Sequence, residues 1–260
     1  MTAVTYLINL DGSDERLALA TRALEAQGLG FERVAAFDGR GVPPASLPGY
    51  DEAGALAYMG RTLRGGEIGC YLSHLDCARR FLATGARFAV VLEDDMAPVP
   101  GAARVLGEVL DWLAGQPGDW DLCNIGAGKR KFFTPLRDFA GEGTTHVLGR
   151  AHYFPMTTTG LIWSREGAGR FVGGHARIDA PVDNHFRRWL TATDRGLAVW
   201  PPLVRPTGAE SEIDAPGARR KVEGRRPLYG LVKQRRLWGD KARAAFHKLR
   251  RGLGGTASGG

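Results

Sequence analysis

The 260-residue sequence lacks the long apolar runs and the nucleotide-loop motifs that would place it in several large protein classes. No stretch approaches the about 18 apolar residues of a membrane span, and MTAVTYLINL has no basic start or apolar run of signal-peptide length. We therefore expect neither a transmembrane helix nor a signal peptide. GAGK at 126–129 lacks the spacing of a P-loop, and no G-x-G-x-x-G follows the first predicted strand, which excludes both motifs.

Cysteine is also scarce, with three residues in the chain. Cys70 and Cys77 lie seven positions apart in a predicted helix, so their Cα atoms are expected to be about 10 Å apart, too far for a disulfide. Cys123 falls in a predicted strand. The sequence therefore predicts free, mostly buried thiols and a cytoplasmic protein.

Positive charge is concentrated near the C-terminus. Residues 219–251 hold 13 Lys and Arg and two acids, which leaves 22 basic and 26 acidic residues elsewhere. Apolar residues recur there at helical spacing with Lys and Arg between them, a pattern typical of a helix lying on an anionic membrane surface. Packing on the body and contact with nucleic acid fit the same pattern. Gly230 and Gly239 argue against one continuous helix.

The charge distribution and composition divide the chain into three parts. We expect a catalytic domain over residues 1–215 and a basic amphipathic tail over residues 216–251. Residues 252–260 are predicted to be a disordered, glycine-rich end.

Strands alternate with helices along the body of the chain, which predicts an α/β fold with a mostly parallel, doubly wound sheet. Residues 39–58, with three prolines, are predicted to be an irregular connection. Pro201 and Pro202 place the last strand at an edge of the sheet. The predicted strands cover residues 4–10, 31–37, 88–92, 121–125, 159–163 and 197–204.

Three acidic residues, Glu93, Asp94 and Asp95, directly follow the apolar run AVVL, which is typical of a strand buried on both faces. Like charges this close repel one another unless a cation lies among them. Ligands bind at the carboxyl ends of strands in such sheets, and carboxylates suit Mg²⁺ and Mn²⁺. The triplet is therefore a candidate metal site, and an acidic loop tip in water is the alternative.

Two further motifs have both a structural and a functional interpretation. Ser73 and His74 lie in the helical segment GEIGCYLSHL, where a histidine is more often a hydrogen-bonded structural residue than a catalyst. Asp183 opens a predicted helix, where it serves as a cap or as a general base in the site.

Three segments in this order, INLDGSDER, GEIGCYLSHL and VVLEDD, resemble glycosyltransferase family 25 over about residues 3–205. This family contains bacterial lipopolysaccharide and lipooligosaccharide glycosyltransferases and is related to animal collagen galactosyltransferases. The resemblance implies an A-type glycosyltransferase fold, in which a Rossmann-like open, mostly parallel sheet with helices on both faces binds a nucleotide sugar and a metal at an acidic motif.

The resemblance also assigns site residues. It implies metal ligation by Asp95 with Glu93, and a general base at Asp183. Family members often have a basic residue at the position of Gly12, and Lys129, Arg130 and Lys131 are the candidates to replace it. The residues implied to contact the nucleotide sugar are Asn9, Asp11, Arg16, Gly69, Ser73, His74 and Asp94.

The expected function is metal-dependent, inverting transfer of a hexose, by default galactose, from a UDP-sugar to a saccharide acceptor in lipopolysaccharide or other surface-glycan biosynthesis. The expected cofactor is Mn²⁺ or Mg²⁺, the acceptor is lipid-linked, and the basic tail holds the protein on the inner face of the cytoplasmic membrane. Nucleic acid is not an expected partner. The alternatives are a metal-dependent nuclease or phosphotransferase, and a non-catalytic nucleic-acid-binding module that uses the tail.

Overall fold

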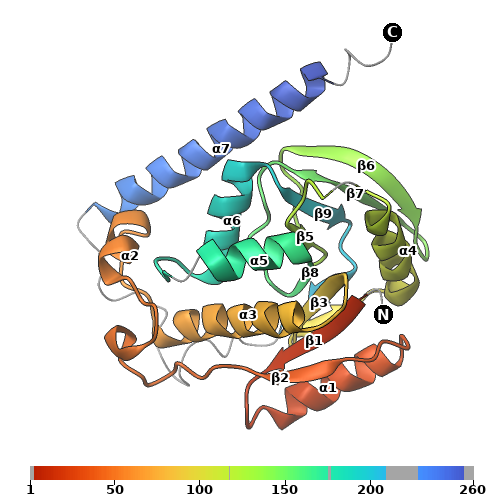
Figure 1. Cartoon of the computed structure of the whole chain (residues 1–260), viewed down its shortest axis with the longest axis horizontal. Coiled ribbons are helices and arrows are strands. Elements are labelled where there is room, and N and C mark those ends of the chain that lie inside the picture. Colours follow the sequence, from red (N-terminus) through yellow and green to blue (C-terminus); the bar gives the residue numbers. More distant parts are fainter. Residues whose placement is uncertain (1–2, 117, 175–176, 209–227, 255–260) are drawn as a thin grey trace.

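An eight-stranded sheet with the order β2-β1-β3-β8-β5-β9-β7-β6 forms the centre of the molecule (Figure 1). The computed structural model describes residues 3–116, 118–174, 177–208 and 228–254. A second, two-stranded sheet pairs β4 with β10. The strands are β1 (Ala3–Asn9), β2 (Glu32–Ala35), β3 (Phe88–Glu93), β4 (Met96–Pro98), β5 (Leu122–Asn124), β6 (Phe133–Ala140), β7 (Thr145–Ala151), β8 (Gly160–Ser164), β9 (Gly196–Trp200) and β10 (Val204–Pro206).

The direction of the strands makes the large sheet mixed but mostly parallel. Strands β2, β1, β3, β5, β9 and β6 run one way, whereas β8 and β7 run the other way. The open α/β sheet expected from the sequence is therefore confirmed, with two reversed strands that the alternation of elements did not reveal.

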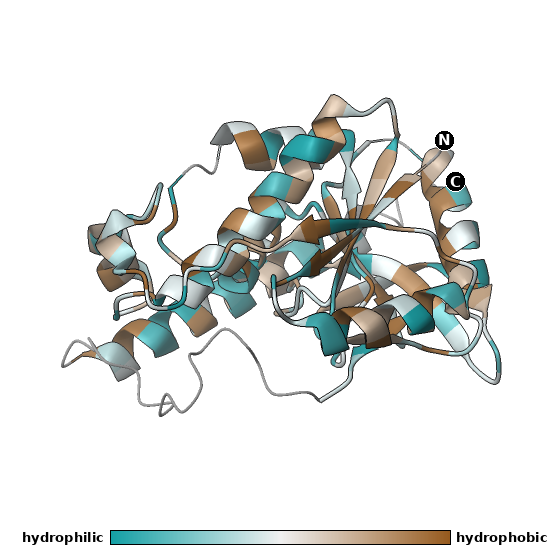
Figure 2. Cartoon of the chain, turned by 90° about the horizontal axis from the view of Figure 1, so that it is seen from below, coloured by the Kyte–Doolittle hydropathy of each residue, from teal (hydrophilic) through white to brown (hydrophobic). Residues whose placement is uncertain are grey.

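Helices cover both faces of this sheet, as expected. Helices α1 (Asp14–Glu25) and α4 (Ala102–Ala114) pack on one face, and α3 (Gly65–Ala83), α5 (Arg165–Gly174) and α6 (Val182–Thr193) pack on the other. Within β3, Ala89 and Val91 face the α3 side, whereas Val90 and Leu92 face the α4 side. Successive side chains point to opposite faces of a strand, so the run AVVL is buried throughout. Figure 2 shows the central strands in the brown of hydrophobic residues between helices of mixed hydropathy.

The edge position predicted for the last strand is wrong. Strand β9 lies between β5 and β7 and ends at Trp200, so Pro201 and Pro202 follow the strand and interrupt no ladder hydrogen bond. The two edges are formed by β2 and by β6, and β6 belongs to a hairpin with β7 that the sequence did not predict. Strand β6 itself contains Pro135, beside a shift in register, as befits an edge strand.

Two other elements differ from expectation. The predicted irregular connection over residues 39–58 contains a 3₁₀ turn (Pro44–Ser46) and helix α2 (Glu52–Tyr58). Helix α7 (Tyr229–Gly254) is continuous, although Gly230 and Gly239 lie within it. Of the predicted tail and the glycine-rich end, residues 216–227 and 255–260 lie outside the described part of the chain. The division into domains stays a prediction.

Helix α7 packs across α6 and α2 on the body of the protein (Figure 1). Arg236 lies over the ring of Tyr58 at 5.0 Å, and Ala244 is fully buried. Near the end of the helix, Arg251 Nε donates to Asp194 Oδ2 over 2.6 Å. Burial raises the pKa of Asp194, but its bonds with His152 and Arg251 outweigh this and lower the pKa to about 2. The helix is thus fixed along one face.

None of the helices in the described ranges is both long enough and apolar enough to span a bilayer.

Candidate active site

The acidic triplet lies where three segments meet. Glu93 ends β3, and Asp94 and Asp95 form the turn before β4. The amide of Asp94 donates to Ile8 O in β1 over 3.1 Å, and the amide of Glu93 donates to Thr159 O over 3.2 Å. These bonds fix the backbone of the turn to the two neighbouring segments, β1 and the residues before β8.

Asp94 is neutralised within the protein. Its Oδ2 accepts a hydrogen bond of 2.7 Å from Asn9 Nδ2, and its Oδ1 forms an ion pair with Arg16. The side chain of Asp94 is buried, and Asn9 is in turn held by Arg33, whose Nε donates to Asn9 Oδ1 over 2.9 Å. The end of β1 and the acidic turn therefore form one rigid wall.

This wall lines a pocket that also contains Ser73 of α3 and the segment from Ala36 to Arg40. The structure thus brings Asn9, Arg16, Ser73 and the acidic triplet together, as expected for a nucleotide site. Asp11 does not line this pocket. Its carboxylate is exposed and pairs with Arg33 at 2.5 Å.

Gly69 and Ser73 position the wall of this pocket opposite the acidic turn. A Cβ atom on Gly69 would come within 2.4 Å of the carbonyl oxygen of Phe37, so only glycine allows α3 to approach this closely. Ser73 Oγ donates to Gly69 O over 2.8 Å and accepts from the amide of Phe37 over 2.9 Å. Gly69 does not line the pocket. The contribution of Gly69 to the site is therefore the close packing of helix against loop.

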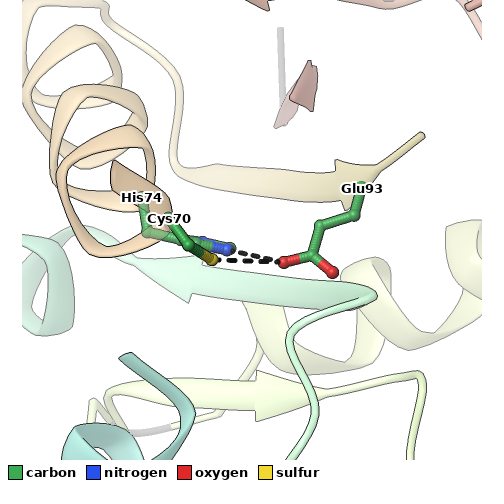
Figure 3. A group of neighbouring side chains, drawn as sticks. All are labelled: Cys70, His74 and Glu93. Atoms are coloured by element: carbon green, nitrogen blue, oxygen red, sulfur yellow. Dashed lines mark hydrogen bonds and ion pairs between the residues drawn. The ribbon is translucent and has the colours of Figure 1, made fainter. Parts of the chain in front are cut away.

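Glu93 is held by side chains from α3 (Figure 3). His74 Nε2 donates to Glu93 Oε1 over 3.1 Å, and the Cys70 thiol reaches the same oxygen over 3.9 Å. Burial raises the pKa of Glu93, but hydrogen bonds from His74 and Thr158 outweigh it, and the net shift is downward. Glu93 is therefore an oriented, ionised carboxylate. His74 acts through Glu93 and lies outside the pocket lining.

The ligating atoms of Cys70, His74 and Glu93 all lie within 4.8 Å of one another, close enough for one ion. Burial and the charge of Glu93 raise the pKa of Cys70 well above its usual range. The thiol is therefore protonated at neutral pH, whereas a metal binds the thiolate. We interpret this group as a hydrogen-bond network that orients Glu93.

Asp95 has the properties of a metal ligand. Its Oδ1 is buried without a hydrogen-bond partner in the described residues. Burial and the charge of Glu93 raise the pKa of Asp95 to about 6. A buried, unpaired carboxylate oxygen is costly, and a hard divalent cation would relieve the cost. The residues present thus fit the Mn²⁺ or Mg²⁺ that the family resemblance implies, with Asp95 as the first ligand and Glu93 beside it.

Asp183 lies in a second pocket, which shares Cys70 and Glu93 with the first. The residue before α6 is Pro181, so Asp183 is in the first turn of the helix and is not its N-cap. Its Oδ1 accepts bonds from the backbone and side-chain nitrogens of Asn184 over 2.6 and 2.9 Å. Burial raises the pKa of Asp183. The carboxylate therefore lies next to the acidic turn with a strengthened affinity for a proton.

Several residues of these pockets were not predicted from the sequence. Cys70 lies in the predicted segment GEIGCYLSHL, whose helical period places it one turn before His74. Arg61 and Glu67 line the second pocket and form an ion pair of 2.6 Å. No sequence pattern marks Arg61. Lys129, Arg130 and Lys131, the proposed replacements for a basic residue at Gly12, are absent from the lining of the first pocket.

Comparison with known proteins identifies the family that this sequence resembles. The family model described as glycosyltransferase family 25 (LPS biosynthesis protein) matches residues 2–111. This range includes the Asn9 segment, α3 and the acidic turn and ends before Asp183. The family resemblance inferred from the sequence is thereby confirmed.

Curated relatives bear names from the same family. Procollagen galactosyltransferase 1 of Danio rerio is 28% identical over 224 residues, which cover 78% of this chain and 36% of the relative. A glycosyltransferase 25 family member of Aedes aegypti is 31% identical over 78% of this chain and 35% of the relative. An inactive glycosyltransferase 25 family member 3 of Mus musculus is 31% identical over 62% of this chain and 28% of the relative. The chain thus spans about a third of the length of these relatives.

A solved structure of a glycosyltransferase involved in the glycosylation of the major capsid of PBCV-1 aligns over 81% of this chain and 95% of that chain. The TM-score is 0.41 and the sequence identity is 10%.

Proposed function

We propose that this chain transfers a hexose from a UDP-sugar to a hydroxyl group of a saccharide, with inversion. Its residues 2–111 match the model of glycosyltransferase family 25. The observation that carries this proposal is the pair of adjoining pockets that share Glu93. One contains Asp95, whose buried Oδ1 has no hydrogen-bond partner in the described residues, and the other contains Asp183, whose pKa is raised by burial. Relatives named galactosyltransferases favour galactose as the hexose.

The mechanism follows from the surroundings of these residues. Asn9, Arg16 and Asp94 form the fixed wall against which the nucleotide lies. Asp95 and Glu93 would hold a Mn²⁺ or Mg²⁺ ion, which would supply positive charge to stabilise the departing diphosphate. Asp183 accepts the proton of the attacking hydroxyl, since burial raises its pKa and makes it a stronger base.

The test is a screen of donors against the full chain. We expect UDP-hexoses, and not GDP- or CMP-sugars, to raise the melting temperature in the presence of Mn²⁺ and to yield free UDP when an acceptor saccharide is added. EDTA is expected to remove both effects. Phosphodiesterase activity without binding of UDP-sugars would instead identify a nuclease or phosphotransferase. Strong, salt-dependent DNA binding without UDP binding would identify a nucleic-acid-binding module.

As part of the same proposal, the outer face of α7 binds an anionic membrane, and the acceptor is linked to a lipid of that membrane. Leu231, Trp238, Phe246 and Leu249 lie within one arc of the helix at 100° per residue, and each is more than 60% exposed. The arc is flanked by Lys241 and Lys248 on one side and by Arg243 and Arg250 on the other. An apolar stripe between two cationic borders fits the interface of an anionic bilayer. The proposed location is the inner face of the cytoplasmic membrane.

Replacing two residues of this stripe, Trp238→Ser and Phe246→Ser, is expected to weaken binding to vesicles about tenfold or more, because each ring loses its burial in the lipid. The measurement is co-sedimentation of the full chain with phosphatidylglycerol-containing vesicles at physiological salt. Leu136→Ser, an exposed apolar residue of β6, is the control and should bind as the parent does. Equal binding by the stripe variant and the parent would contradict a role of α7 at the membrane.

A further inference from the structure

A cationic cleft lies beside the active site and has no part in the mechanism above. It is formed by the segment that follows β5, the segment that precedes β8, and helices α6 and α7. Its lining contains four cations, Lys129, Lys131, Arg187 and Lys241, and no carboxylate. We call these four residues with their lining neighbours the basic cleft. Four like charges around one hollow repel one another, and a bound anion would remove that repulsion.

Arg187 is held in place by groups that carry no negative charge. Its Nε donates to Phe154 O over 2.7 Å, and its guanidinium lies over the ring of Tyr153 at 4.3 Å. No carboxylate of the described residues lies within 4.0 Å of its nitrogens, and burial lowers its pKa by more than the nearby charges of Asp183 and Asp240 raise it. A partly buried guanidinium fixed by neutral partners is pre-organised for an anion that comes from outside.

Lys129, Lys131 and Lys241 add charge that can adjust to a ligand. No ion pair or hydrogen bond links any of the three to a carboxylate in the part of the chain that the structure describes. Arg130, between the first two, turns away and lies over the ring of Trp200 at 4.5 Å. The segment 129–131 thus presents two of its three cations to the cleft.

The basic cleft adjoins the pocket of the proposed base and is separate from the pocket of Asn9 and Arg16. It shares Thr157 with the pocket that contains Asp183 and Glu93, but shares no lining residue with the pocket of Asn9 and Arg16. A ligand in the cleft can therefore extend past Thr157 toward the proposed base without passing through the nucleotide pocket. Met156 and Leu237 provide apolar surface in the same cleft.

We propose that the basic cleft binds the phosphate group of a phosphorylated saccharide acceptor and directs its sugar toward Asp183. This assignment rests on the proposed glycosyl transfer and names the class of acceptor. The phosphate belongs either to a sugar phosphate or to the diphosphate link of a lipid-borne sugar, and both present the same anionic oxygens to Lys and Arg. Because α7 supplies Leu237 and Lys241, the docked helix completes the acceptor site.

The experiment measures binding, so that it does not depend on turnover. The full chain, with its nucleotide pocket filled by saturating UDP and Mg²⁺, is titrated by calorimetry with N-acetylglucosamine 1-phosphate and with N-acetylglucosamine. The variant Lys129→Ala/Lys241→Ala removes two cations of the cleft. The control Lys233→Ala/Arg235→Ala removes two exposed cations of α7 that do not line it.

We expect the sugar phosphate to bind the parent and the control equally, and the cleft variant about tenfold more weakly, as the loss of two partly screened ion pairs predicts. The unphosphorylated sugar should bind at least tenfold more weakly than the phosphate in the parent. Equal affinity of the cleft variant and the parent would overturn the proposal, as would an equal loss in both double variants.

Two further measurements distinguish the two sources of phosphate, and distinguish failure of the acceptor site from failure of the proposed glycosyl transfer. Tighter binding of the same sugar on a short prenyl diphosphate identifies a lipid-borne acceptor, and equal binding identifies a sugar phosphate.

UDP affinity is measured in parallel. If the cleft variant loses affinity for UDP instead, the cleft belongs to the donor and the acceptor assignment is overturned. If UDP does not bind the parent, the proposed function fails, while phosphate binding in the cleft is still decided by the titration without UDP.

Discussion

Asp95→Asn is expected to remove the response of the protein to Mn²⁺ and to lower hexose transfer by about 10³-fold. The asparagine keeps the shape of the side chain but loses the charge that a divalent cation requires. Electrostatic stabilisation of a departing diphosphate contributes several kcal/mol, and each 1.36 kcal/mol changes the rate about tenfold. The measurement combines the thermal shift on adding Mn²⁺ with the rate of UDP release.

The same substitution should stabilise the metal-free protein. The pKa of Asp95 is raised to about 6, so the folded state binds its proton more tightly than the unfolded state does. Without metal, stability therefore falls as pH rises from about 4 to about 6, and the full cost of about 3 kcal/mol is present at pH 7. Asp95→Asn removes this cost and should raise the melting temperature in EDTA by about 8 °C at pH 7.

Asp111→Asn, at an exposed position of α4, is the matched control and should change neither the melting temperature nor the response to Mn²⁺. A Mn²⁺-dependent thermal shift that persists unchanged in Asp95→Asn would remove Asp95 from the metal site. In that case the group of Cys70, His74 and Glu93 would become the site to test, because its ligating atoms are close enough to share an ion.

Asp183→Asn is expected to lower the turnover number by about 10²–10⁴-fold, the usual contribution of a general base, and to leave donor binding unchanged. The reason is geometric. Asp183 shares a pocket with Glu93 but does not line the pocket of Asn9 and Arg16. Removing its basicity should therefore affect the step in which the acceptor hydroxyl loses its proton, and not the affinity for the nucleotide sugar.

Steady-state kinetics with varied UDP-sugar separate these effects, since the donor KM should stay within about twofold of the parent while kcat falls. Asp138→Asn, exposed on β6, serves as the control for loss of one carboxylate. An unchanged kcat would leave Asp183 with only its structural role in the first turn of α6, where it accepts hydrogen bonds from Asn184.

The local parts of the site could be predicted from the sequence. The apolar run AVVL determines a buried strand, so the carboxylates that follow it must emerge at the carboxyl end of the sheet. The helical period of GEIGCYLSHL places Cys70 and His74 on one face, because residues four apart are neighbours on a helix. Asp183 opens a predicted helix, where the local pattern fits a cap and a general base alike, and the resemblance to family 25 added weight to the role of base.

The amino-acid sequence by itself determined the alternation of strands and helices over much of the chain, the burial of β3, and the crowding of three acids at its end, because these depend on neighbours along the chain. Only the tertiary structure decided how the three acids differ. Arg16 neutralises Asp94, His74 orients Glu93, and Asp95 keeps a buried oxygen without a partner in the described residues. The basic cleft likewise joins segments that lie far apart in the sequence. Such contacts between distant segments depend on how the elements pack, and local hydrophobic periodicity does not encode that arrangement.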